Sequence, residues 1–102
     1  MKVLFSAYAK QELQDAVTYY ALEYPGLGLR FKEEIIKATH RIAGYPEVWS
    51  IESGSIRKCL LHKFPYKILY SIESDHIFVI AVAHQHRRPD YWIDRDAPED
   101  KK

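Results

Sequence analysis

Residues 56–84 read IRKCLLHKFPYKILYSIESDHIFVIAVAH, and this stretch decides which fold the rest of the chain must complete. It is rich in Ile, Val, Tyr and Phe, and it is interrupted by Pro65 and by the polar residues ESDH. Such runs between turn residues are typical of strands. We therefore expect an antiparallel meander of three strands over residues 56–63, 66–73 and 77–84. The run IFVIAVA is apolar at every position, which predicts a central strand covered on both faces.

Before this stretch the apolar residues recur at spacings of three and four, which is the period of a helical face. The spacing predicts helices over residues 8–24 and 27–43. The first stripe consists of Ala9, Leu13, Ala16, Val17, Tyr20 and Tyr24, and the second of Leu27, Phe31, Ile35, Ala38 and Ile42. Ser6 can cap the first helix, and Pro25-Gly26 separates the two. Two amphipathic helices joined by so short a turn form an antiparallel helical hairpin.

The apolar residues VLF at positions 3–5 predict a short N-terminal strand. The chain is then one strand, a helical hairpin and a meander, an order that indicates an α+β fold. We expect the antiparallel helical hairpin to pack on one face of a small, mainly antiparallel sheet. The length of 102 residues supports a single domain, which we assign to residues 1–93. Residues 94–102 are expected to be a flexible acidic tail.

Composition narrows the class of protein. Cys59 is the single cysteine, so no internal disulfide can form, and a cytoplasmic location fits best. No apolar run approaches the ~18 residues that would span a membrane, so no membrane partner is expected. The four glycines are scattered and form no phosphate-binding loop. We expect no cofactor.

The end of the predicted meander, VAHQHRRPDYW at residues 82–92, combines histidines, arginines and aromatic residues. Residues 53–72 carry four basic side chains and no acid, so the second half of the chain favours an anionic partner. A histidine beside cations could act as a general acid or base on a phosphodiester. As a ribonuclease, the chain would use His84, Arg57, Lys67, Arg87 and Tyr91.

The same side chains could equally form a binding surface without chemistry. That basic and aromatic surface for a target would contain Arg57, Lys63, Lys67, Arg87, Arg88, Tyr91 and Trp92. Trp92 has a second interpretation, because it could instead fold a short C-terminal turn back onto the sheet. His84 and His86 offer only two ligands where zinc needs three or four, so we expect no metal site.

The order of these elements and several residues resemble the RelE/ParE superfamily of toxins from bacterial type II toxin–antitoxin systems. The resemblance spans roughly residues 2 to 92 and is greatest to the ParE-like plasmid stabilisation branch. It is carried by AGYPEVW after the helical hairpin, by IRKCLLHKFPYKILYSIE and by VAHQHRRPDYW. These marks are specific for the superfamily in their order and spacing, and less specific for the activity.

The resemblance implies two functions. ParE-like members inhibit DNA gyrase without being enzymes, whereas RelE-like members are ribosome-dependent mRNA endoribonucleases. RelE-like proteins tend to have arginines where this chain has Lys67 and Gln85, and a tyrosine that Tyr91 matches. Lysine lacks the bidentate fork of arginine, so the resemblance favours the ParE-like gyrase inhibitor. The ribonuclease is the alternative, and a toxin-fold protein with neither activity is the third option.

Both toxin functions imply the same kind of regulating partner. A cognate antitoxin would hold the toxin inactive, with its C-terminal segment wrapping the toxin as a helix or an added strand. The grooves of the helical hairpin, an exposed sheet edge and the basic stretch offer suitable surfaces. The other partner would be DNA gyrase, or the ribosome with its mRNA.

Overall fold

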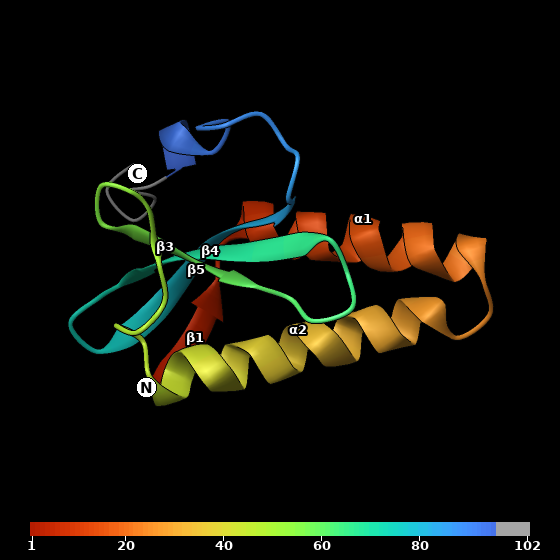
Figure 1. The fold of residues 1–102 in the computed structure, drawn as a ribbon, viewed down its shortest axis with the longest axis horizontal. Helices are drawn as coiled ribbons and strands as arrows, with labels where there is room; N and C mark the ends of the chain where they lie inside the picture. The colour runs from red at the N-terminus through yellow and green to blue at the C-terminus, as the bar shows by residue number, and fades with distance from the viewer. Residues whose placement is uncertain (96–102) are drawn as a thin grey trace.

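The protein is an α+β fold in which two helices pack on a five-stranded mixed sheet (Figure 1). The computed structural model describes residues 1–95. The elements in chain order are β1 (Lys2–Phe5), α1 (Ala7–Glu23), α2 (Leu27–Gly44), β2 (Ile51–Ser53), β3 (Ile56–Leu60), β4 (Tyr66–Ile72), β5 (His76–His84) and a single 3-10 turn at Ile93–Arg95. The sheet order is β1-β5-β4-β3-β2, with β1 parallel to β5 and the other neighbours antiparallel. This confirms the predicted fold class.

The helical hairpin forms as the apolar spacing predicts. Ser6 caps α1 by accepting a hydrogen bond from the Ala9 amide at 3.0 Å. The two helices approach closely at Gly28, where an added Cβ would lie 2.6 Å from the Val17 carbonyl oxygen. The second apolar stripe is buried from Phe31 to Ile42, whereas the first is fully buried only at Ala9 and Ala16 and half-buried at its other helical positions. Tyr24 is 65% exposed and lies beyond the last helical residue of α1.

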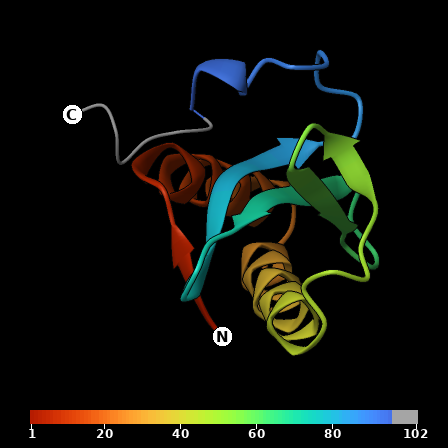
Figure 2. The ribbon, with the colours of Figure 1, turned by 90° about the vertical axis from the view of Figure 1, so that its left-hand side faces the viewer.

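The sheet is buried on both faces, but by different parts of the chain. On one face α1 and α2 enclose the main core, which includes Phe31, Ile35, Ile68 and Val79. On the other face a smaller cluster forms under the C-terminal segment, which we define as residues 85–95 (Figure 2). This second cluster consists of Ile56, Leu69, Ile80, Ala81 and Trp92, with Phe78 and Tyr91 packed against it. Strand β5 is an interior strand between β1 and β4, in keeping with its continuous apolar run.

Strand β5 contains an irregularity that changes which side chains face the helices. Leu69 pairs with Ala81 and Tyr70 pairs with Val79, so Ile80 is an extra residue in the β5 ladder. Ile80 and Ala81 consequently both belong to the cluster on the far face, and Val82 returns to the helix side. Strand β1 pairs with β5 only as far as Val79, so the rest of this edge of β5 depends on other partners.

The structure differs from the sequence prediction at three places. Strand β2 is not among the strands that the sequence pattern predicts, and the first meander strand ends at Leu60 rather than at residue 63. The expected flexible tail begins too early, because Ile93–Arg95 form the 3-10 turn and Arg95 is held by an ion pair. Residues 96–102 of that expected tail lie outside the described residues. Within residues 1–95 no helix is both long and apolar enough to cross a membrane.

Candidate functional site

Arg57 lies on the face of the sheet that the helices cover. It pairs with Tyr70 across β3 and β4, and paired residues share a face. Its guanidinium donates a hydrogen bond to the Trp49 carbonyl oxygen at 2.6 Å. This bond ties β3 to the loop that follows α2, so Arg57 has a structural partner in the free protein.

Lys67 lies on the opposite face of the sheet. Successive side chains of β4 point to alternate faces, and Lys67 is three residues from Tyr70. Lys67 therefore points away from the helices, as Leu69 does. Its ammonium group is 3.3 Å from Glu52 of β2, and Lys58 is 3.7 Å from the same carboxylate. Lys63 lies on neither face of the sheet, because it is exposed in the turn between β3 and β4, where its φ is 74°. Arg57, Lys63 and Lys67 therefore do not converge.

The C-terminal segment brings Arg87 and Tyr91 together but buries Trp92. The Arg87 guanidinium lies 3.9 Å from the centroid of the Tyr91 ring, and Arg88 is exposed. Trp92 is only 1% exposed, so its predicted place on a target-binding surface is wrong. The indole instead fills the cluster on the far face of the sheet, as the second interpretation of this residue stated.

Glu12 of α1 is the residue that holds this segment, and sequence reasoning missed it. Tyr91 donates its phenolic hydrogen to Glu12 Oε2 at 2.8 Å, and Arg95 forms an ion pair with Glu12 Oε1 at 3.0 Å. Burial, and then the hydrogen bond to the carboxylate, raise the pKa of Tyr91 well above its usual range. The phenol is therefore a stable donor rather than a group ready to lose its proton.

His84 ends β5 on the helix side, where it pairs with Tyr66. Its ring is 5.4 Å from the ring of Tyr66, and burial raises the pKa of that phenol. The Nδ1 atom of His84 accepts a hydrogen bond from the His86 amide at 3.1 Å, so a neutral imidazole carries its proton on Nε2. Arg57 is on the same face, but its β4 partner is four residues from that of His84.

These positions show which sequence-predicted residues meet. Arg87 and Tyr91 are in contact, His84 immediately precedes the same segment, and Arg88 follows Arg87 in sequence. Arg57 and Lys67 lie elsewhere, so the full set expected for a ribonuclease does not surround one point. Lys63 of the predicted binding surface is also apart from them. Among residues 1–95 no three His, Cys, Asp or Glu side chains are grouped closely enough to hold a metal ion.

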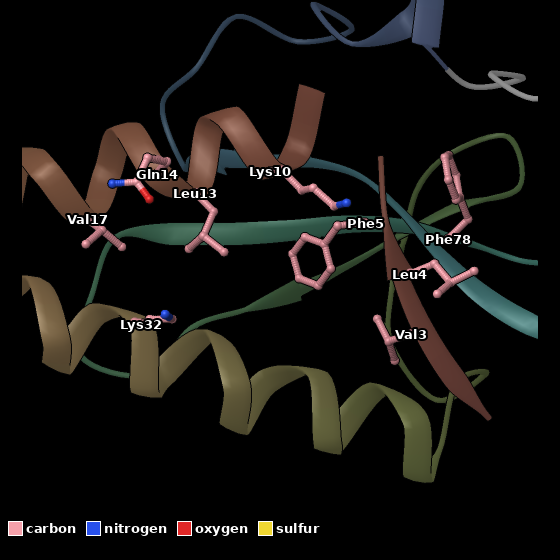
Figure 3. Close-up of a pocket in the computed structure, with 9 residues that line it drawn as sticks. All are labelled: Val3, Leu4, Phe5, Lys10, Leu13, Gln14, Val17, Lys32 and Phe78. Carbon is pink, nitrogen blue, oxygen red and sulfur yellow. The ribbon is translucent and has the colours of Figure 1, made fainter. Parts of the chain in front are cut away.

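A separate groove of about 660 Å³ lies between the two helices and the free edge of β1 (Figure 3). Phe5 of β1 and Leu13 of α1 point into it, and Lys10 and Lys32 lie along its sides. None of the residues predicted as functional lines it. The remaining lining residues are Val3, Leu4, Gln14, Val17 and Phe78. An apolar floor beside an unpaired strand edge and two cations is suited to an extended or helical segment with acidic side chains.

Comparison with known proteins identifies the class. The model of the family described as "ParE toxin of type II toxin-antitoxin system, parDE" matches residues 3–89. This chain therefore belongs to the ParE toxin family of type II toxin–antitoxin systems. A cognate ParD antitoxin is the partner that a parDE system implies.

A solved structure supports the fold independently. It is described as "Chromosomal ParDE TA system from P. aeruginosa" and superposes with a TM-score of 0.68 at 14% sequence identity. The match covers 82% of this chain and 95% of that one. At this identity the likeness shows a shared fold and says nothing of individual functional residues. No curated protein matches the chain.

Proposed function

We propose that this ParE toxin inhibits DNA gyrase and thereby arrests bacterial growth until its antitoxin binds it. The observation that carries the proposal is the family match over residues 3–89. The target surface would be the exposed basic part of the C-terminal segment, with Arg87 stacked on Tyr91 and Arg88 beside it. Such a surface can recognise an acidic or phosphate-bearing region of a partner. The proposal places the toxin in the cytoplasm, where gyrase acts.

The arrangement of the side chains supports a binding protein over a ribonuclease. General acid–base catalysis needs the acid, the base and the cations around one reacting phosphate. Here Arg57 and Lys67 occupy opposite faces of the sheet, and each has a partner in the protein. Tyr91 donates to Glu12, and its raised pKa opposes its use as a base. The ribonuclease is therefore the outcome against which the experiment discriminates.

We further propose that the antitoxin occupies the groove between the helices and β1. Its backbone would add to the free edge of β1, and its apolar side chains would cover Phe5 and Leu13. Acidic side chains flanking that segment would pair with Lys10 and Lys32. The groove and the C-terminal segment are separate sites, so antitoxin affinity and gyrase inhibition can be changed independently.

Two variants test this separation. Arg87→Ala/Arg88→Ala should weaken inhibition of supercoiling by purified gyrase and relieve growth arrest, with antitoxin affinity retained. Lys10→Glu/Lys32→Glu should weaken antitoxin binding by about tenfold or more, since both charges become repulsive, and should leave inhibition intact. Ribosome-dependent cleavage of mRNA is measured in parallel. Cleavage of mRNA with supercoiling unaffected would replace the gyrase proposal with the ribonuclease.

A further inference from the structure

Beyond Val79, the edge of β5 that faces β1 has its backbone hydrogen bonds satisfied by side chains rather than by a neighbouring strand. The ladder between β1 and β5 ends at Val79, whose carbonyl oxygen accepts a hydrogen bond from the Ser6 amide. The next backbone groups on this edge that lack a strand partner are the Ile80 carbonyl and the Val82 amide. Arg95 donates to the Ile80 carbonyl oxygen at 3.2 Å, and the Val82 amide donates to Glu12 Oε1 at 2.9 Å. Arg95 is in turn paired with the same Glu12 carboxylate.

Glu12 thus joins three parts of the chain. Its Oε1 atom accepts from β5 and from Arg95, and its Oε2 atom accepts from Tyr91. Both Arg95 and Glu12 are largely shielded from water, with side-chain exposures of 14% and 17%. Hydrogen bonds to a charged, shielded group are stronger than those between neutral groups. No other carboxylate in the described residues contacts the C-terminal segment in this way.

The contacts with Glu12 also determine where the guanidinium groups of Arg87 and Arg95 lie. The Tyr91 ring has Arg87 at 3.9 Å and Arg95 at 4.9 Å, and Arg95 also lies 4.6 Å from the ring of Tyr8. Because two guanidinium groups share one ring, the direction of Arg87 depends on where Tyr91 is held. The hydrogen bond from Tyr91 to Glu12 fixes that position.

We propose that Glu12 is the positioning residue of the C-terminal segment and sets the geometry with which Arg87 meets the target. This inference rests on the proposed function, because it assigns the segment to gyrase recognition. Glu12 itself touches no target. It acts by holding Tyr91 and Arg95 against α1 and the edge of β5, so that the cations reach the target in one arrangement rather than several.

The experiment compares Glu12→Gln and Glu12→Ala with Glu23→Gln, which makes the same chemical change at an exposed position of α1. Hydrogen exchange of the Val82 amide and the NMR chemical shift of the Trp92 indole N–H both report on the segment directly. We expect the alanine variant to lose protection at Val82 and to need about tenfold more toxin to inhibit gyrase, in keeping with the loss of charged hydrogen bonds. Glutamine keeps one acceptor oxygen for Val82 and should fall between alanine and wild type.

A positioning role predicts a split that general destabilisation would not produce. Antitoxin affinity, measured on the same samples, should stay within about twofold of wild type, because the groove lies on another side of α1. Tyr91→Phe provides a second variant that removes one hydrogen bond and keeps the ring between the arginines. It should weaken inhibition without loss of protection at Val82.

Each outcome is decisive for one of the two ideas. Loss of protection at Val82 with undiminished gyrase inhibition would overturn the positioning role and leave the gyrase proposal standing. Equal loss of inhibition and of antitoxin affinity would reduce Glu12 to a stabilising residue and overturn the inference too. Failure of the wild-type toxin to inhibit gyrase would sink the proposed function, whereas the exchange data would still show whether Glu12 orders the segment.

Discussion

Arg57 and Lys67 point to opposite faces of the sheet, although both belong to the basic stretch of the meander. Arg57 donates to the Trp49 carbonyl oxygen on the helix side, and Lys67 pairs with Glu52 on the other side. Groups separated in this way, with no shared partner, contribute independently to stability. A linear sequence places these two cations in one surface, whereas the pleat of the sheet separates them.

The first prediction follows from this separation. The changes that Arg57→Ala and Lys67→Ala cause in the free energy of unfolding should add, with a coupling below about 0.5 kcal/mol. Lys67→Ala and Glu52→Ala should instead couple measurably, because each removes the partner of the other. Urea unfolding of the single and double variants measures both. A coupling between Arg57 and Lys67 as large as that between Lys67 and Glu52 would contradict the opposite-face placement.

The second prediction concerns the buried indole of the C-terminal segment. Trp92→Ala should lower the free energy of unfolding by about 3–5 kcal/mol, as expected for removing a large aromatic side chain from a packed core. Tyr45→Ala is the control, because that ring is 73% exposed and its loss should cost less than about 0.5 kcal/mol. Equal effects of the two changes in thermal and urea unfolding would mean that Trp92 does not pack against the sheet.

The third prediction uses two glycines of the same helix. Gly28→Ala should lower the free energy of unfolding by about 1–3 kcal/mol, because its Cβ would meet the Val17 carbonyl oxygen at 2.6 Å. Gly44→Ala should be neutral or stabilising by up to ~1 kcal/mol, since nothing lies within 4 Å and alanine has less freedom to lose. The unfolding midpoint should fall for Gly28→Ala and should stay level or rise for Gly44→Ala. If both variants lose stability equally, the close approach of α1 and α2 is not what restricts position 28.

The fourth prediction is the effect of alkaline pH. Burial raises the pKa of Tyr70 to about 12, and its hydroxyl donates to the Pro46 carbonyl oxygen at 2.7 Å. The unfolded tyrosine loses its proton near pH 10, while the folded one keeps it. The stabilising contribution is therefore complete below about pH 10 and is lost as pH rises to about 12.

Tyr70→Phe should flatten this part of the pH dependence, at a cost of about 1 kcal/mol at neutral pH from the lost hydrogen bond. Tyr24→Phe is the control, because that ring is 65% exposed in the folded protein. The measurement is urea unfolding at several pH values from about 9, below the unfolded pKa near 10, up to the folded pKa of about 12. A slope unchanged by Tyr70→Phe would show that other tyrosines dominate.

The helical hairpin and the meander could be predicted because their apolar periods are local and long. Residues 8–24 and 27–43 repeat their stripes over four turns or more, and β5 is apolar from Ile77 to Ala83. Strand β2 could not be predicted, because three residues are too few for an alternation to be read. Its place in the sheet is decided by pairing with β3, which local sequence does not encode.

The candidate site was predicted less completely, and Glu12 shows why. In the sequence it is one of several polar residues between the apolar positions of the first predicted helix, with nothing to distinguish it from Glu23. Its partners Val82 and Tyr91 are 70 and 79 residues away. Trp92 was instead assigned a functional role that it does not have, because an aromatic residue shortly after Arg87 and Arg88 matches the composition of a recognition surface. Only the packing of the C-terminal segment shows that the indole is inside.

The extra residue in β5 has a consequence for how this chain should be aligned with its relatives. Side chains on either side of Ile80 keep their faces because the bulge absorbs one position. A relative with an unbroken β5 would need one residue fewer between Val79 and Val82 to present the same faces. We therefore expect a single-residue gap at positions 80–81 when such sequences are compared. Aligned without that gap, the two chains would match inward-facing residues with outward-facing ones, and His84 would be assigned to the wrong side.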